Sequence, residues 1–212
     1  MIIILVSFIS GLILLFLLKS LAIRFKVLIP KDIPLIGGLS IWLSFTIACW
    51  ISPFLYAGLS SEARGILYSC AIMLFFGIID DWKELAVSAK FLIEIIATAV
   101  LIIFGIKTQI VYIGTIPNII ITLVWVLGVT NAFNHLDITD GLAAGIAIIV
   151  TLSFLIIAIS NNDINTIILT LALLGSLTSF FIFNFPPAKI YMGNSGSHFL
   201  GFFLAAAALT IS

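Results

Sequence analysis

Four polar side chains recur at every third position between two strongly apolar segments: Asn131, Asn134, Asp137 and Asp140. In a helix, this spacing would place them along one slowly drifting stripe. Carboxylates and carboxamides at the end of a membrane span are energetically expensive, and such groups indicate by default an ion, proton or substrate site. The simpler alternative is a polar loop between two spans that carries no chemistry. These four residues are therefore candidate site residues.

Two adjacent carboxylates, Asp80 and Asp81, end another apolar run. Paired carboxylates provide the oxygen ligands that Mg²⁺ binds, and Mg²⁺ often shares such ligands with substrate phosphates. Alternatively, one of the two acts as a base toward a phosphate or a hydroxyl. A surface pair at a helix end, close to Lys83, would need neither function.

A glycine-bearing turn, Gly193-Asn194-Ser195-Gly196-Ser197, leads into the last apolar segment. Backbone N–H groups of such a turn, at a helix N-terminus, can bind phosphate. A second glycine pair, Gly37-Gly38, opens an earlier apolar segment. Taken alone, either turn is more often an ordinary helix start.

Three further polar residues within apolar surroundings receive no role from the sequence. Glu94 is expected to pair with Lys90 at i,i+4, or to extend toward the membrane surface. His135 and His198 are expected to be polar filler.

Composition decides the class of protein. The chain is 63% hydrophobic and 8% charged, with a mean hydropathy of +1.36, which is typical of an integral membrane protein. The net charge of zero argues against a nucleic-acid partner. Cys49 and Cys70 both lie in apolar runs, so neither a disulfide framework nor a metal-binding knuckle is expected. Residues 1–18 could pass as a signal peptide, but they contain no basic N-terminal region and the basic residues come after them, which favours a retained first span.

The hydropathy pattern predicts an all-α, polytopic membrane bundle, a single domain over residues 1–212. A span needs roughly 20 mainly apolar residues. On that template we expect about eight spans, at residues 2–18, 35–57, 65–79, 91–106, 116–130, 142–160, 165–184 and 198–211.

Basic residues predict the orientation of these spans. Seven of the nine Lys and Arg residues fall in alternate loops, namely Lys19, Arg24, Lys26, Lys31, Lys83, Lys90 and Lys189. Only Arg64 and Lys107 fall in the other set. The positive-inside rule therefore predicts a multi-pass protein of the inner (plasma) membrane with the N-terminus outside. All three polar clusters then face the cytoplasm, which favours one composite site.

With these motifs in view, the chain resembles the polyprenyl-phosphate N-acetylhexosamine-1-phosphate transferases, which start peptidoglycan, teichoic acid, common-antigen and O-antigen synthesis. The resemblance is collinear and covers nearly the whole chain. The blocks that carry it are Ile33–Gly38, Asp80-Asp81, Asn131–Gly145 and Asn184–Gly201. The residues of the last block are most similar to those of the O-antigen and common-antigen branches of the family.

The resemblance implies a function, a cofactor and partners. It implies transfer of N-acetylhexosamine 1-phosphate from a UDP-sugar to a polyprenyl phosphate such as undecaprenyl phosphate, which initiates a cell-envelope polysaccharide. It implies Mg²⁺, with Mn²⁺ as the alternative, and leaves a homodimer open. By resemblance, the catalytic residues are Asp80, Asp81, Asp137 and Asp140, the substrate-binding residues are Gly193, Ser195, Gly196 and Ser197, and the metal-facing residues are Asn134 and Asn194.

The chain departs from the family pattern at three places. Asn194 stands where the pattern has a metal-binding aspartate, and an amide ligand lacks the charge that makes such a site tight. Ile138 stands where the pattern has a glycine, which tolerates backbone angles that a branched residue avoids. Further C-terminal spans of the family, which carry a histidine-containing loop for the nucleotide sugar, are expected to be missing. A catalytically impaired or inactive relative is therefore one alternative. A small transporter is another, and it predicts broken helices with acids near the bilayer midplane.

Overall fold

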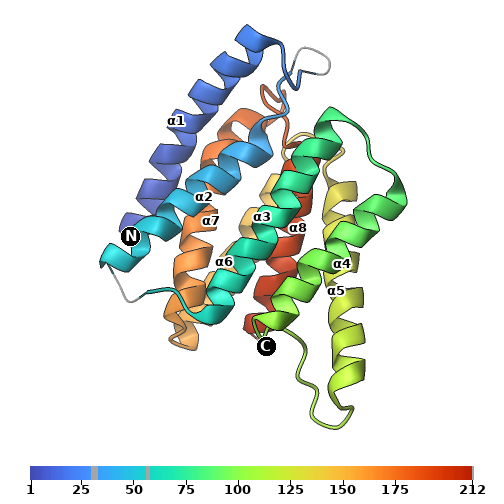
Figure 1. The fold of residues 1–212 in the computed structure, drawn as a ribbon. Coiled ribbons are helices and arrows are strands. Elements are labelled where there is room, and N and C mark those ends of the chain that lie inside the picture. The colour runs from blue at the N-terminus through green and yellow to red at the C-terminus, as the bar shows by residue number, and fades with distance from the viewer. Residues whose placement is uncertain (30–32, 56–57, 212) are drawn as a thin grey trace.

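The computed structural model describes residues 1–29, 33–55 and 58–211, and Lys31 lies outside these ranges. In them the chain forms eight α-helices and no strand (Figure 1). The helices are α1 (Ile2–Phe25), α2 (Gly37–Leu55), α3 (Ser61–Trp82), α4 (Val87–Ile103), α5 (Thr115–Leu136), α6 (Leu142–Ser160), α7 (Ile164–Asn184) and α8 (Gly193–Thr210). Each predicted span corresponds to one helix, which confirms the all-α bundle.

Local signals explain where several helices begin and end. The Ser60 hydroxyl accepts a hydrogen bond from the Ala63 amide at the start of α3, and the Asp163 carboxylate accepts two at the start of α7. Lys26 ends α1 in the left-handed conformation, with φ of 53°. Helix α1 continues to Phe25, past the predicted span end at residue 18, because nothing before Lys26 interrupts it.

Most of the helices have the length and composition of membrane spans. By these criteria, five helices in the described part of the chain can cross a membrane, namely α1, α3, α5, α6 and α7, and α2 contains a shorter apolar stretch. Helix α4 is shorter and carries Lys90 and Glu94, whereas α8 begins with polar residues. Large apolar side chains such as Phe16, Trp125 and Ile149 are exposed on the outer helices. A water-soluble surface would not tolerate so much exposed apolar area, so these faces meet lipid.

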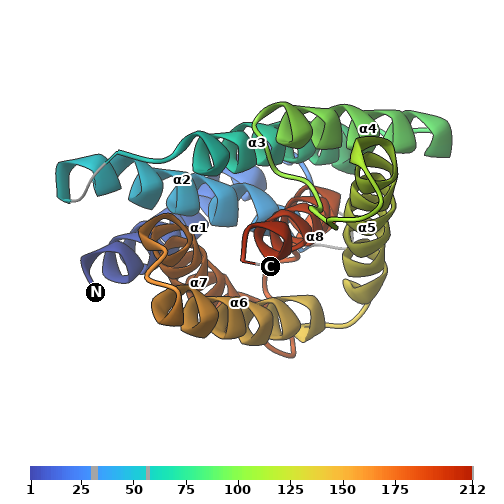
Figure 2. The ribbon, with the colours of Figure 1, turned by 90° about the horizontal axis from the view of Figure 1, so that it is seen from below.

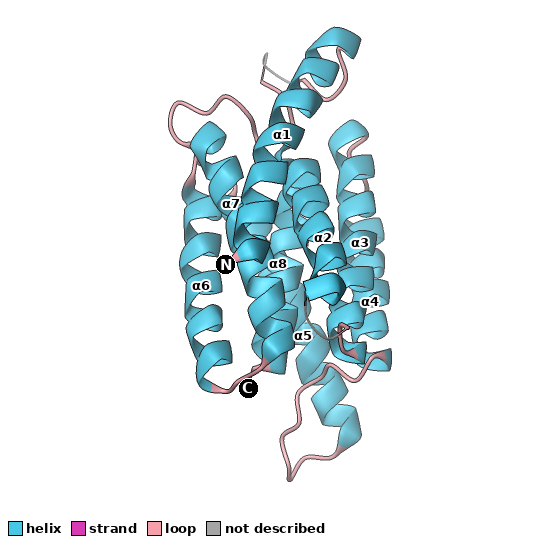
Figure 3. Ribbon diagram, turned by 90° about the vertical axis from the view of Figure 1, so that its left-hand side faces the viewer, coloured by secondary structure: helices cyan, strands magenta, loops and turns pink. Residues whose placement is uncertain are grey.

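Helix α8 lies in the middle of the bundle, with α3 and α5 packed against it (Figure 2). Its residues Ser195–Ala207 are all buried. On the opposite side of the bundle, α1 packs against α7 and α2 (Figure 3).

Glycines allow the closest helix contacts. A Cβ at Gly38 would overlap the backbone of Gly196, and a Cβ at Gly77 would overlap the backbone of Ser195. Small residues let membrane helices approach closely in this way. The glycine pair at the start of α2 therefore serves helix packing.

Successive helices run in opposite directions (Figure 1). The C-terminal ends of α1, α3, α5 and α7 therefore lie at the same end of the bundle as the N-terminal ends of α2, α4, α6 and α8. All three polar clusters of the sequence fall at this end, which we call the site end.

Candidate functional site

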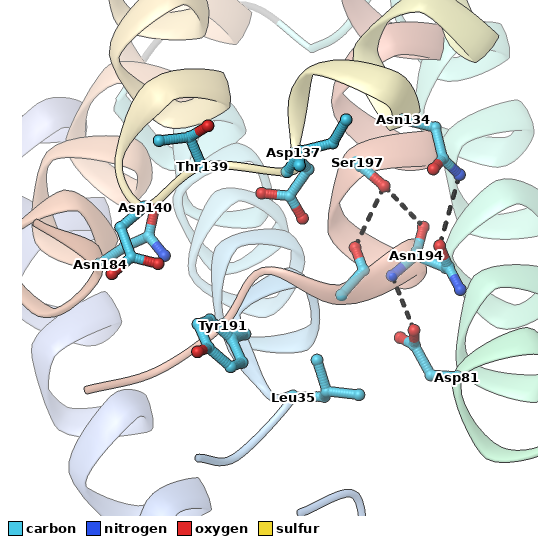
Figure 4. Close-up of a pocket in the computed structure, with 12 residues that line it drawn as sticks. Leu35, Asp81, Asn134, Asp137, Thr139, Asp140, Asn184, Tyr191, Asn194 and Ser197 are labelled. Atoms are coloured by element: carbon cyan, nitrogen blue, oxygen red, sulfur yellow. Dashed lines mark hydrogen bonds between the residues drawn. The ribbon is translucent and has the colours of Figure 1, made fainter. Parts of the chain in front are cut away.

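A cavity of about 360 Å³ opens at the site end. It is lined by the ends of α3, α5, α7 and α8 and by the segments next to them (Figure 4). The lining residues are Leu35, Asp81, Asn134, Asp137, Ile138, Thr139, Asp140, Asn184, Tyr191, Gly193, Asn194 and Ser197. The structure thus brings most of the sequence-predicted site residues to one place.

Asp81, in the last turn of α3, binds the N-terminus of α8. Its Oδ1 accepts a hydrogen bond from the Asn194 amide at 2.7 Å, and its Oδ2 accepts one from the Ser195 amide at 3.0 Å. A carboxylate in this position also complements the positive end of the helix dipole. The sequence indicated that N–H groups of this turn can bind phosphate, and in the structure the amides of Asn194 and Ser195 bind Asp81.

Gly193 is required where α8 begins. Its φ of +76° is in the left-handed region, and a Cβ there would lie 2.7 Å from Asp81 Oδ2. Gly193 and Ser197 line the cavity, whereas Ser195 and Gly196 are buried and do not. The structure gives the latter two a packing position, and their role in substrate binding stays a prediction.

Asp80 turns away from the cavity that its neighbour lines. It is 3% exposed, its Oδ1 accepts the Leu85 amide at 2.8 Å, and its Oδ2 lies 2.6 Å from Lys90 Nζ. A base role for Asp80 stays a prediction, and it would require the Lys90 ion pair to open or to move with the substrate.

The expected pairing of Glu94 with Lys90 is wrong, because Lys90 pairs with Asp80 instead. Glu94 is only 1% exposed, so it does not extend to the membrane surface either. Its Oε2 accepts a hydrogen bond from Asn131 Nδ2 at 2.8 Å. Its Oε1 has no hydrogen-bond partner among the described residues. The i,i+4 rule could not identify Asn131 as the partner of Glu94, because Asn131 lies on α5 and Glu94 lies on α4.

The Asn131–Asp140 cluster lies only partly on a helix. Helix α5 ends at Leu136, so Asn131 and Asn134 lie on it, Asp137 caps it and Asp140 lies in the following turn. The four polar residues therefore do not form one helical stripe. The turn instead directs Asp137 and Asp140 toward the same cavity as Asn134.

Two hydrogen bonds hold this turn against the segment that joins α7 and α8. Asp140 Oδ2 accepts the Ala188 amide at 2.9 Å, and Asn184 Oδ1 accepts the Gly141 amide at 3.0 Å. Gly141 takes the left-handed conformation, with φ of 75°. Ile138 is 83% exposed and has a negative φ, so a branched residue is accommodated here without backbone strain.

The carboxylates around the cavity repel one another. The pKa of Asp137 is raised to about 7, first by burial and then by the negative charges of Asp81 and Asp140. A bound cation would offset this repulsion.

His198 is a site residue that the sequence analysis missed. Its ring nitrogens lie 2.9 and 3.1 Å from Asn134 Nδ2, which in turn lies 3.4 Å from Asn194 Oδ1. The i,i+4 spacing of Asn194 and His198 on α8 was the available signal.

The donor set suits a hard cation held in part by water or substrate. Among the described residues, no three His, Cys, Asp or Glu side chains form a compact metal-binding group. The oxygen donors on the cavity wall are instead distributed over Asp81, Asp137, Asp140, Asn134 and Asn194. Mg²⁺ characteristically takes one or two carboxylates and completes its shell with water and phosphate oxygens. The residues therefore fit Mg²⁺, which stays a prediction.

A family model described as glycosyl transferase family 4 matches residues 63–212. The chain belongs to this family. The matched part of this family 4 chain begins in α3 and contains every cavity-lining residue except Leu35.

Several curated relatives that match the chain have names that state a reaction. A probable undecaprenyl-phosphate N-acetylglucosaminyl 1-phosphate transferase of Bacillus subtilis is 31% identical over 84% of this chain and 51% of its own length. A decaprenyl-phosphate N-acetylglucosaminephosphotransferase of Mycobacterium leprae is 33% identical over 84% of this chain and 50% of its own. A phospho-N-acetylmuramoyl-pentapeptide-transferase of Lactiplantibacillus plantarum is 43% identical over 42% of this chain and 28% of its own. The family 4 chain spans about half the length of the first two relatives.

Proposed function

We propose that this family 4 chain acts in the transfer of N-acetylhexosamine 1-phosphate from a UDP-sugar to a polyprenyl phosphate such as undecaprenyl phosphate. The observation that carries the proposal is the convergence of three carboxylates and three carboxamides on one cavity at the end of a membrane bundle. The names of the relatives support the same reaction class.

The chemistry asks mainly for positioning and for neutralised charge. In the reaction, an oxygen of the lipid phosphate bonds to the sugar-linked phosphorus of the UDP-sugar. The bond from that phosphorus to the bridging oxygen breaks, and UMP leaves. Phosphoryl transfer of this kind depends on orientation and electrostatic stabilisation more than on covalent help from the protein.

The residues divide these tasks. Asn134, Asn194 and Asp137 would hold Mg²⁺, which when bound supplies positive charge next to the phosphates. Asp81 fixes the start of α8 and thereby the position of Asn194. Asp80 would accept the proton of the lipid phosphate once Lys90 is drawn to that phosphate.

The place of the cavity suits one lipid substrate and one soluble substrate. A polyprenyl phosphate reaches the bundle end from the bilayer plane, and a nucleotide sugar reaches it from water. We assign the site end to the cytoplasmic side of the plasma membrane, because most of the basic residues lie there. The position of the acids at one end of the bundle disfavours a transporter with a midplane site.

A catalytically impaired relative is the second candidate, and Asn194 favours it. An amide in place of a carboxylate removes one charge from the proposed cation site.

Radiolabel transfer from UDP-GlcNAc to undecaprenyl phosphate, in membranes of a host that lacks its own enzyme, tests the proposal. We expect metal-dependent transfer that Asp80→Asn lowers by about 100-fold or more. Glu84→Gln is the control, because Glu84 is exposed in the neighbouring loop. Transfer that survives both EDTA and Asp80→Asn would refute the assignment. Metal binding without any transfer would favour the impaired relative.

A further inference from the structure

We propose that His198 is a positioning residue that turns the Asn134 carboxamide so that Oδ1 faces the cavity as a ligand for a divalent cation. This inference rests on the proposed function, since it concerns the cation of the same site.

The hydrogen bonds of Asn134 fix the direction of its amide. Nδ2 of Asn134 lies within 3.1 Å of both ring nitrogens of His198 and 3.4 Å from Asn194 Oδ1. A carboxamide nitrogen only donates, so it donates to the His198 ring nitrogen that carries no hydrogen and to the amide oxygen of Asn194, while the other ring nitrogen of the neutral imidazole carries the hydrogen. The NH₂ group of Asn134 therefore belongs on this side, and Oδ1 must point the other way.

That other direction is the cavity. Asn134 lines it, and Asn134 Oδ1 accepts no hydrogen bond from the described residues. Figure 4 shows this oxygen on the side of Asp137 and Ser197, and the amide nitrogen directed at Asn194. An unused acceptor beside mutually repelling carboxylates is suited to a cation.

The imidazole of His198 is itself held in place. His198 is 1% exposed, and its ring stacks on the ring of Phe76 with centroids 5.3 Å apart and planes 4° apart. Phe76 lies one turn before Asp80 on α3. The contact chain Phe76–His198–Asn134 thus connects α3, α8 and α5 behind the cavity wall.

Loss of the imidazole would free the amide to rotate. A turn of 180° would present the NH₂ group to the cation and replace attraction with repulsion. Groups that orient metal ligands in this way typically change metal affinity by roughly 10- to 100-fold.

The role of His198 is tested directly by measuring how tightly the purified full chain binds Mn²⁺. Electron paramagnetic resonance reports the free Mn²⁺, and Mg²⁺ is added as a competitor. His198→Leu should raise the Kd for Mn²⁺ about tenfold or more. His198→Gln, whose amide oxygen can accept from Asn134, should recover most of the affinity. His135→Leu is the matched control, because His135 is exposed at the same end of α5 and should leave the Kd unchanged.

A double variant separates orientation from packing. A carboxylate carries oxygens on both sides, so Asn134→Asp should make the Mn²⁺ affinity insensitive to His198→Leu. A purely structural role of His198 predicts the same loss in both backgrounds, together with a lower unfolding temperature, and would overturn the inference.

The remaining outcomes distinguish this inference from the proposed function. If His198→Leu binds Mn²⁺ with the affinity of the wild type, the role of His198 is overturned and the proposed function is unaffected. Absence of Mn²⁺ and Mg²⁺ binding by the wild-type chain overturns both. The predicted affinity changes without any sugar-phosphate transfer would uphold the role of His198 and count against the reaction.

Discussion

At the scale of single residues, the site is defined by carboxylate charge that the protein does not itself neutralise. Asp80 has Lys90 as a partner, and Asp81 has two backbone amides. Asp137 faces the cavity and has neither kind of partner among its described contacts. Its charge is therefore the one most dependent on a bound cation.

The raised pKa of Asp137 predicts a pH-dependent cation affinity. In the folded chain, burial and the charges of Asp81 and Asp140 raise this pKa from 3.8 to about 7. Below about pH 7 the folded chain holds Asp137 mainly in its neutral form, whereas the unfolded chain already ionises it above its ordinary pKa of 3.8. The contribution of this bound proton to the free energy of unfolding is therefore lost as the pH rises through about 7. Since a cation binds the carboxylate, Mn²⁺ affinity should increase between about pH 6 and about pH 8. Titrations at both pH values check this, and an equally steep increase in Asp137→Asn would contradict it.

The residue at position 194 sets the charge of the proposed cation site. Asn194→Asp adds one carboxylate, and ligand charge tunes such sites over orders of magnitude, so we expect Mg²⁺ to bind about tenfold more tightly. In EDTA the same variant should be less stable than wild type, because the new charge lies beside Asp81. Calorimetric titration and thermal unfolding measure the two effects. Asn161→Asp is the control, since Asn161 is exposed at the opposite end of the bundle.

At the scale of elements, the sequence predicts the helices well and the contacts between them poorly. Eight apolar segments and their boundary residues are local signals, and each became a helix. That Asp81 would bind the N-terminus of α8 could not be predicted, because the contact joins residues more than a hundred positions apart. For the same reason, Glu94 and His198 received no role. Their partners, Asn131 and Asn134, lie on another helix.

The contact between α3 and α8 should be sensitive to a single methyl group. Gly77→Ala would force a Cβ into the backbone of Ser195, and overpacking of this kind destabilises by roughly 1–3 kcal/mol. It would also move Asp81, one helical turn later, so Mn²⁺ affinity should fall together with the unfolding temperature. Gly128→Ala on α5 is the matched control. No heavy atom lies within 4 Å of a Cβ built there, so alanine should be neutral or stabilise slightly through helix propensity. Equal stability of the two variants would show that the close approach of α3 and α8 is unimportant.

At the scale of the whole molecule, charge and topology agree on one site. The alternation of helix directions brings residues from α3, α5, α7 and α8 to one end, and the helix ends and loops at that end together carry most of the basic residues. Chemistry that joins a lipid phosphate to a water-soluble nucleotide sugar needs a site at such an interface. The proposal therefore depends on which side of the membrane the site end faces.

Cysteine labelling in intact cells decides this orientation. Cys49 and Cys70 are both buried, so they should contribute little background with a membrane-impermeant maleimide. Lys83→Cys and Lys189→Cys place exposed thiols at the site end, and Gln109→Cys places one at the other end. If the site end is cytoplasmic, only the thiol at position 109 should react in intact cells, and all three should react once the membrane is permeabilised. Reaction at position 83 or 189 in intact cells would place the cavity outside, where a cytosolic nucleotide sugar does not reach it, and would refute the proposed reaction together with the topology.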